Sequence, residues 1–232
     1  MDQRPIILLD LDNTILNFDI AERTALSRAL TLLGVPFDDE TLAKYNRINL
    51  RHWEMLEDGI LTREQVLVQR FEALYREIGV QADAFRTQQL YETLLAEGHW
   101  FMPGAEDLLK ELRGKYRLFL CSNGTQSVQD GRIESAGIAP FFEQIFVSEH
   151  MGSNKPEKRY FDLCFARIPD FRAQRCLIVG DSLTSDIRGG LNAGILTCWF
   201  NPAGRPRRGG IEPHYEIRAL EELPPLLEVC FG

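Results

Sequence analysis

Two aspartates follow directly on the first apolar segment of the chain. Residues 5–9 form a continuous apolar run, and Asp10 and Asp12 come immediately after it. A single aspartate at such a place often caps a turn. Two close carboxylates, however, repel each other, so that the pKa of one rises or a cation binds between them. A carboxyl group with a raised pKa suits a general acid, and its ionised partner suits a nucleophile or a metal ligand.

Two further polar segments have the composition of an anion site. Ser122, Asn123 and Gly124 follow a second apolar run. They form either an ordinary turn or a cradle in which a hydroxyl and backbone amides at a helix N-terminus bind a phosphate oxygen. Lys155 precedes Pro156, which is expected to fix the start of a helix. Lys155 is either a solvated surface lysine or a cation that reaches the same anion.

A second set of carboxylates follows a later apolar run. Asp181 comes after residues 176–179, and Asp186 lies five positions further on. The segment could cap the next helix. If the strand before Asp181 neighbours the strand before Asp10, the two carboxylates face each other at the carboxyl edge of the sheet, where open parallel sheets bind ligands. Oxygen ligands from two strands suit a hard cation such as Mg²⁺.

Apolar runs and helical patterns alternate along most of the chain. Short apolar runs are typical of strands buried on both faces of a parallel sheet. Their alternation with helical patterns indicates helices on both faces of that sheet. The predicted strands are residues 5–9, 117–121, 145–148, 176–179 and 196–200, and the predicted helices are residues 105–112, 127–136, 157–168 and 185–193.

Residues from about 19 to 98 interrupt this alternation with four consecutive helical patterns. Thr62 and Gln65 have the spacing of a capping box at the start of the third. Each pattern ends near a glycine suited to the left-handed conformation that closes many helices, namely Gly34, Gly59, Gly79 and Gly98. We therefore predict a helical insertion, residues 17–98, in an α/β core of residues 1–16 and 99–232. Residues 201–213, rich in Gly, Pro and Arg, are a predicted surface loop.

The composition of the chain excludes some classes of protein and of binding partner, and it favours one cellular compartment. The 232 residues are 44% hydrophobic and 10% aromatic, which excludes a disordered chain. Acidic residues outnumber basic ones by 34 to 26, which argues against binding to nucleic acid or to an anionic membrane through net charge. No apolar run approaches the ~20 residues that cross a bilayer. The five cysteines are odd in number and lack a C-x-x-C pair, which favours reduced thiols. We expect a cytoplasmic protein that is a monomer or a weak dimer.

The polar segments, taken in order, resemble the four motifs of the haloacid dehalogenase-like (HAD) hydrolase superfamily. The resemblance covers essentially the whole chain and implies a three-layer, Rossmann-like core with an inserted helical cap of type I. Several stretches further resemble bacterial pyrimidine 5′-nucleotidases: residues 15–19, 45–53, 59–62, 70–71 and 186–201.

The resemblance implies a role for each motif residue in hydrolysis of a phosphomonoester. Asp10 matches the nucleophile that becomes an aspartyl phosphate, and Asp12 matches the acid and base that serves the leaving group and then water. Ser122 and Lys155 match the groups that hold the transferring phosphoryl oxygens. Asp181 matches a Mg²⁺ ligand, together with the Asp10 carboxylate and the Asp12 backbone carbonyl.

Two points stay open at this level. Asp186 either binds Mg²⁺ through water or orients Lys155. In the cap, the candidates for reading a substrate are Asn46, Asn49, Trp53 and Arg70, although each fits an ordinary helix face equally well.

The predicted activity is that of a Mg²⁺-dependent 5′-nucleotidase acting on pyrimidine or non-standard nucleoside monophosphates. A sugar-phosphate phosphatase or phosphomutase on the same scaffold is the first alternative. A non-catalytic module that binds a phosphorylated ligand is the second. Dehalogenation is disfavoured, because it would not need both Asp12 and Asp181.

Overall fold

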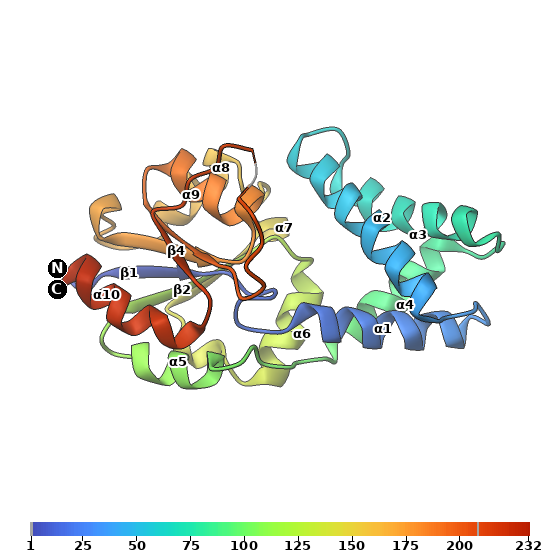
Figure 1. Ribbon diagram of the computed structural model, residues 1–232, viewed down its shortest axis with the longest axis horizontal. Helices are drawn as coiled ribbons and strands as arrows, with labels where there is room; N and C mark the ends of the chain where they lie inside the picture. Colours follow the sequence, from blue (N-terminus) through green and yellow to red (C-terminus); the bar gives the residue numbers. More distant parts are fainter. Residues whose placement is uncertain (1, 208) are drawn as a thin grey trace. The chain divides into compact units, whose positions relative to one another are not determined.

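The computed structural model describes residues 2–207 and 209–232. The chain divides into two compact units (Figure 1). The α/β unit consists of the residues up to Phe18 and of His99–Gly232, and the helical unit is Asp19–Gly98. Asn17 and Phe18, which we expected in the insertion, thus group with the α/β unit. Arg208, part of the predicted loop 201–213, lies outside the described residues.

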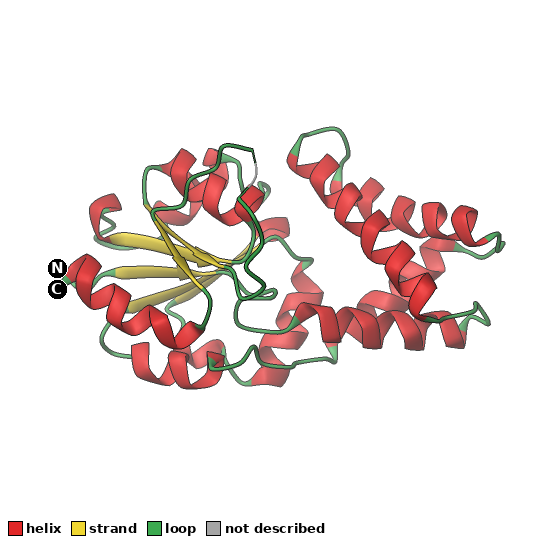
Figure 2. Ribbon diagram, in the orientation of Figure 1, coloured by secondary structure: helices red, strands yellow, loops and turns green. Residues whose placement is uncertain are grey.

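Within the described residues, six strands form one sheet in the order β3-β2-β1-β4-β5-β6, and every neighbouring pair is parallel (Figure 2). Leu9 lies opposite Leu120 in β2 and Val179 in β4, so the carboxyl ends of these three strands meet at one edge. The strands are β1 (Ile6–Leu9), β2 (Arg117–Ser122), β3 (Gln144–Val147), β4 (Cys176–Gly180), β5 (Leu196–Phe200) and β6 (Tyr215–Ile217).

Helices cover both faces of the sheet, and β1 supplies the core on each side. Ile7 and Leu9 pack in a cluster with α5, α6 and α10, while Ile6 and Leu8 pack on the other face with α8. This arrangement confirms the predicted Rossmann-like α/β class. The helices of this unit are α5 (Ala105–Leu112), α6 (Gln126–Ala136), α7 (Ser148–Met151), α8 (Lys158–Phe165), α9 (Arg188–Ala193) and α10 (Leu223–Phe231), with short turns at Ala139–Phe141, Ala173–Arg175 and Leu220–Glu222.

The predicted strands end within one residue of the observed ones, but three details differ. The edge strand β6 was missed, because it is three residues long and only Ile217 in it is buried. Pro156 does not start a helix, since α8 begins at Lys158. The helix predicted over 185–193 begins only at Arg188, because Leu183–Ile187 form a wider π-helical turn in which Ile187 N donates to Ser182 O.

The helical unit consists of α1 (Phe18–Leu32), α2 (Asp39–Glu57), α3 (Arg63–Ile78) and α4 (Ala84–Ala96). The predicted capping box is present, with Thr62 accepting from Gln65 N and Gln65 accepting from Thr62 N. Gly34, Gly59 and Gly79 have the expected positive φ. Gly98 does not, because α4 ends at Ala96 and the capping residue Glu97 is right-handed, so the chain needs no left-handed residue there.

The cysteines are free thiols, and all but Cys230 are buried. This agrees with the expectation of reduced thiols. Among the described residues, no helix combines the length and the apolar character needed to cross a membrane. The cytoplasmic location stays a prediction.

Candidate active site

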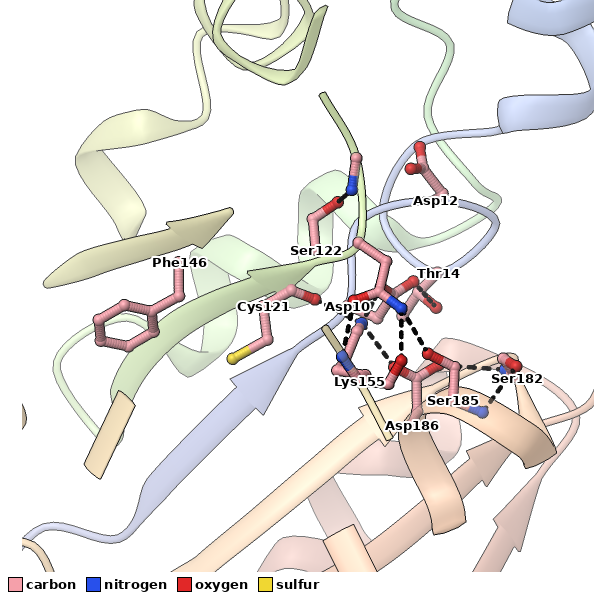
Figure 3. A network of polar contacts seen from close by, with 12 residues as sticks. Asp10, Asp12, Thr14, Cys121, Ser122, Phe146, Lys155, Ser182, Ser185 and Asp186 are labelled. Atoms are coloured by element: carbon pink, nitrogen blue, oxygen red, sulfur yellow. Dashed lines mark hydrogen bonds and ion pairs between the residues drawn. The ribbon is translucent and has the colours of Figure 1, made fainter. Parts of the chain in front are cut away.

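A buried lysine joins the first and last of the polar segments. Lys155 Nζ donates to Asp10 Oδ1 at 2.6 Å, to Asp186 Oδ1 at 2.7 Å and to the backbone carbonyl of Cys121 at 2.7 Å. The Lys155 side chain is 2% exposed and that of Asp186 1%. Figure 3 shows the three side chains converging at the carboxyl edge of the sheet. Lys155 is therefore a buried cation whose three ammonium protons are all used.

Backbone pairing and one amide side chain hold these groups in place. Asp10 follows β1, and its N–H donates to Val179 O at 2.9 Å, which extends the pairing of β1 with β4. Thr14 Oγ1 donates to Asp10 Oδ2 at 3.2 Å. Asn123 Nδ2 donates to the Lys155 carbonyl at 2.8 Å, and Lys155 N donates to Asn123 Oδ1 at 2.9 Å. Asn123, predicted as an anion contact, thus also anchors the backbone of Lys155.

The π-helical turn after β4 brings Asp186 back against the end of that strand. A Cβ at Gly180 would lie 2.2 Å from the Asp186 carboxyl carbon, so only glycine leaves room for this approach. Asp186 Oδ2 accepts from Ser182 N at 3.1 Å. The direct contact of Asp186 with Lys155 is the geometry expected if Asp186 orients the lysine, one of the two alternatives that the sequence left open. The role of Asp186 stays a prediction.

Asp181 lies beside this group and has a cationic partner of its own. Arg205 Nη2 donates to the Asp181 carbonyl at 2.8 Å and to Asp181 Oδ2 at 3.1 Å. Trp199 Nε1 donates to the same carbonyl at 2.8 Å. Burial, with the repulsion of Asp186 added, raises the pKa of Asp181 to about 7.

Carboxylate oxygens of Asp10, Asp181 and Asp186 all lie within 4.8 Å of one another. Burial raises the pKa of Asp10, and Asp186 adds to that shift while Lys155 opposes it. Burial alone would lower the pKa of Lys155, but Asp10 and Asp186 raise it. Two of these carboxylates thus share one buried ammonium group, and Asp181 pairs with Arg205. Oxygen donors at this spacing fit a hard divalent cation such as Mg²⁺.

Asp12 lies apart from this cluster, toward α6 (Figure 3). Its Oδ2 accepts from Gln129 Nε2 at 2.7 Å, and its Oδ1 accepts from Arg132 Nη1. Gln129 Nε2 also donates to Ser122 Oγ at 2.8 Å. A Cβ at Gly124 would lie 2.2 Å from Gln129 Nε2, so Gly124 provides the space that Gln129 occupies.

Sequence reasoning missed Gln129, Arg132 and Arg205. A sequence pattern that could have indicated Gln129 and Arg132 lies in α6, the helix that follows β2. Val128, Gln129, Arg132 and Ile133 occupy one buried face of α6. Long polar side chains on a core-facing stripe are rarely buried unless they are paired, so this pattern indicates a partner. Arg205 lies in a loop whose sequence gives no such signal.

The residues predicted to read a substrate fall into two groups within the helical unit. Asn49 and Arg70 are buried, and Arg70 Nη1 donates to Asn49 Oδ1 at 2.8 Å. Asn46 is exposed, and Trp53 is half-buried under the Arg63 guanidinium. Their role in substrate recognition stays a prediction.

The family model of haloacid dehalogenase-like hydrolases matches residues 5–194, which contain all the carboxylates of the site and Lys155. The chain belongs to this family. The segments that resemble the HAD motifs lie within this range, and they meet at the carboxyl edge of the sheet.

Curated HAD relatives align along nearly the whole chain. It is 44% identical to the HAD-hydrolase YfnB of Bacillus subtilis, with 96% of this chain and 95% of YfnB covered. It is 34% identical to the pyrimidine 5′-nucleotidase PynA of Streptococcus pneumoniae, covering 96% and 94%. It is 33% identical to the pyrimidine 5′-nucleotidase YjjG of Escherichia coli, covering 95% and 96%. A crystal structure of YfnB bound to magnesium matches with a TM-score of 0.93 at 43% identity, covering 97% of this chain and 99% of that one.

The HAD site offers two chemically different carboxylates. Asp10 is buried beside a cation, and Asp12 is partly exposed and held by neutral and cationic donors of α6. The first arrangement suits attack on an electrophile whose negative charge Lys155 offsets. The second suits proton transfer at a distance from that charge.

Proposed function

We propose that the protein is a Mg²⁺-dependent phosphomonoesterase that acts through an aspartyl phosphate on Asp10. The observation that carries this proposal is the buried Lys155, which joins Asp10 to Asp186 with Asp181 beside them. A lone carboxylate would repel a phosphate dianion. A nucleophilic Asp10 therefore needs cations on either side of it, and this cluster provides one and can hold another.

Asp10, Asp181 and Asp186 would hold Mg²⁺, with the Asp12 backbone carbonyl as a further expected ligand. When bound, the cation would neutralise charge on the phosphoryl group. Lys155 supplies the second positive charge, and it is fixed by Asn123 at its backbone and by three acceptors at its ammonium group.

The proposed reaction uses the two carboxylates in turn. An Asp10 oxygen attacks phosphorus, the bond from phosphorus to the ester oxygen breaks, and the leaving alkoxide takes a proton from Asp12. Asp12 then takes a proton from water, which attacks the aspartyl phosphate and releases inorganic phosphate and the Asp10 carboxylate. Ser122 and the backbone amides of residues 123–124 would hold the phosphoryl oxygens. Lys155 would join them by exchanging one of its three present acceptors for a phosphoryl oxygen.

We infer that the substrates are nucleoside monophosphates with a pyrimidine or non-standard base. The names of PynA and YjjG support this choice, because both relatives align over nearly their full length. In this proposal the helical unit discriminates among leaving groups. Asn46 and Trp53 are its candidate residues, since Asn49 and Arg70 are buried in a hydrogen-bonded network of their own.

A phosphate-release screen tests the proposal. The full-length protein, with and without Mg²⁺, is assayed against 5′-nucleotides and sugar phosphates, with Asp10→Asn as the control for contaminating activity. We expect Mg²⁺-dependent release that is fastest with pyrimidine nucleotides. Faster release from sugar phosphates would favour a sugar phosphatase, and an isomerised product would indicate a phosphomutase. No release from any ester would indicate a binding module.

A further inference from the structure

A second buried cation in the α/β unit lies outside the cluster around Lys155. Arg132 in α6 is fully buried, and its guanidinium pairs with the Asp12 carboxylate. Its carbon Cζ lies 5.4 Å from the centre of the Phe18 ring. A buried guanidinium is costly without a counter-charge, and Asp12 is the carboxylate that Arg132 contacts.

Gln129 completes a closed set of contacts around Asp12. Arg132 Nη1 donates to Gln129 Oε1 at 3.0 Å, which orients the amide so that Nε2 faces Asp12 and Ser122. Gln129 is 2% exposed, and the absence of a side chain at Gly124 makes its position possible. Each Asp12 oxygen thus has its own donor from α6.

The contacts from α6 matter because the Asp12 side chain is less enclosed than that of Asp10. The Asp12 side chain is 29% exposed, whereas that of Asp10 is 9% exposed and held by Lys155 and Thr14. Without its two donors, the Asp12 carboxylate would be free to rotate toward water. The backbone after β1 fixes the position of the Asp12 Cα atom, and α6 fixes the position of its carboxyl group.

We propose that Gln129 and Arg132 are positioning residues that align the Asp12 carboxyl group for proton transfer to the leaving group. The inference rests on the proposed function. It assigns to α6 a task in the reaction that none of the polar motif segments performs. Because Gln129 also bonds Ser122, the same helix sets the Asp12 carboxyl group and the Ser122 hydroxyl relative to each other.

The leaving group gives a readout that a purely structural role would not move. The alkoxide of uridine 5′-monophosphate needs a proton as it departs, whereas p-nitrophenolate departs without one. The ratio kcat/KM reports the steps up to formation of the aspartyl phosphate, which include this proton transfer and exclude the later attack of water. Misalignment of Asp12 should therefore lower kcat/KM for the nucleotide far more than for p-nitrophenyl phosphate.

The experiment compares Arg132→Met and Gln129→Leu with the wild-type full-length protein on both substrates in Mg²⁺. A positioned general acid contributes about 10²–10⁴-fold. The measured quantity is kcat/KM for uridine 5′-monophosphate divided by kcat/KM for p-nitrophenyl phosphate. We expect Arg132→Met to lower this ratio by about 30-fold and Gln129→Leu to lower it by about 10-fold. If Arg132→Met does not fold, as judged by its thermal unfolding, Gln129→Leu decides.

Arg117 offers a closely matched control. It is a buried arginine in the same unit, its Nη2 pairs with Glu143 Oε2 at 2.6 Å, and its Cζ lies 5.4 Å from the Phe119 ring centre. It begins β2, so it lies at the end of the strand away from Ser122. Arg117→Met should lower stability and leave the substrate ratio unchanged.

Each remaining result contradicts one of the two proposals. Equal losses on both substrates for Arg132→Met and Gln129→Leu would make these residues structural, and a rise of the ratio would make Arg132 a restraint on Asp12. Either result overturns the positioning role while leaving the phosphatase proposal intact. Failure of the wild-type protein to release phosphate from both esters would overturn the proposed function, and the inference with it.

Discussion

Two of the buried cations, Lys155 in the α/β unit and Arg70 in the helical unit, have different kinds of hydrogen-bond partner. In the α/β unit, Lys155 contacts Asp10 and Asp186, and Asp181 lies beside them. In the helical unit, Arg70 donates to two neutral amides, Asn49 Oδ1 and Gln88 Oε1, both at 2.8 Å. The first cation faces an excess of negative charge, whereas the second faces none directly.

The surroundings of Arg70 show how a helical core accommodates a charge. Its guanidinium carbon lies between 5.1 and 5.9 Å from the ring centres of Tyr91, Phe71 and Tyr45. Its counter-charge is Glu22, which accepts from Asn49 Nδ2 at 2.8 Å and is thus one amide away. One positive and one negative group, each hydrogen-bonded, form a balanced scaffold.

The difference in charge balance distinguishes the candidate active site around Lys155 from the structural network around Arg70. Buried carboxylates in excess destabilise the fold, so we expect a ligand cation to offset the charge around Lys155. A balanced buried pair needs no ligand. We therefore expect changes around Lys155 to alter chemistry and changes around Arg70 to alter stability.

The largest effect is expected at the nucleophile. Asp10→Asn should lower kcat by about 10⁴-fold or more, because an amide cannot form the aspartyl phosphate. The fold should persist, since the amide oxygen can still accept from Lys155 while the amide NH2 group donates to the Thr14 hydroxyl oxygen. Phosphate release and circular dichroism measure the two quantities. Retention of more than a tenth of the wild-type rate would place the nucleophile elsewhere.

At the other cation, stability should change rather than chemistry. Arg70→Met should lower the free energy of unfolding by about 3 kcal/mol, because it breaks a buried polar network and leaves the Glu22 side of that network without its counter-charge. Urea unfolding measures this loss. At urea concentrations well below the unfolding midpoint, the rate of p-nitrophenyl phosphate hydrolysis should stay within about threefold of the wild-type rate. A large loss of turnover without loss of stability would make Arg70 part of the site.

Within the cluster, the metal and proton-transfer roles should separate. Asp181→Asn should weaken Mg²⁺ binding by about 10- to 100-fold, because it removes a ligand charge. Asp12→Asn should leave Mg²⁺ affinity nearly unchanged, since only its backbone carbonyl is an expected ligand, while turnover still collapses. Calorimetric titration of both variants decides. Equal losses of affinity would contradict this division.

The smallest effect concerns the half-exposed cation beside Asp181. Arg205→Met should tighten Mg²⁺ binding by about threefold, because a positive charge that competes for Asp181 is removed in a partly solvated place. Arg207→Met is the matched control, since Arg207 lies in the same loop but pairs with Glu212 and Glu216. Weaker binding in Arg205→Met alone would mean that Arg205 organises Asp181 for the metal.

The sequence predicted the residues that follow strands. Asp10 and Asp181 could be placed because an apolar run indicates a buried strand, and because parallel strands bring their carboxyl ends to one edge. Their expected proximity is confirmed by the pairing of β1 with β4. Lys155 was found through its motif, although its burial and its three acceptors depend on Asn123 and on the turn after β4.

The sequence did not predict residues whose role comes from tertiary approach. Gln129 and Arg132 reach Asp12 because α6 packs against the loop after β1, more than a hundred positions away in the chain. Gly124 was interpreted as part of a turn or an anion cradle, and Gly180 was given no role, but each leaves the space that another side chain fills. Such steric roles depend on the neighbour rather than on the residue itself.

The strand order also constrains how the protein assembles during synthesis. β1 is made first yet lies between β2, which begins at Arg117, and β4, which begins at Cys176. Its four fully apolar residues leave the ribosome long before either neighbour exists, and pairings so distant in sequence form slowly. Until then β1 is an unpaired apolar strand of the kind that drives aggregation of nascent chains. The helical unit, whose contacts are local, can fold in that interval. The nascent chain then holds a finished helical unit while the strand that leads into Asp10 still awaits its partners.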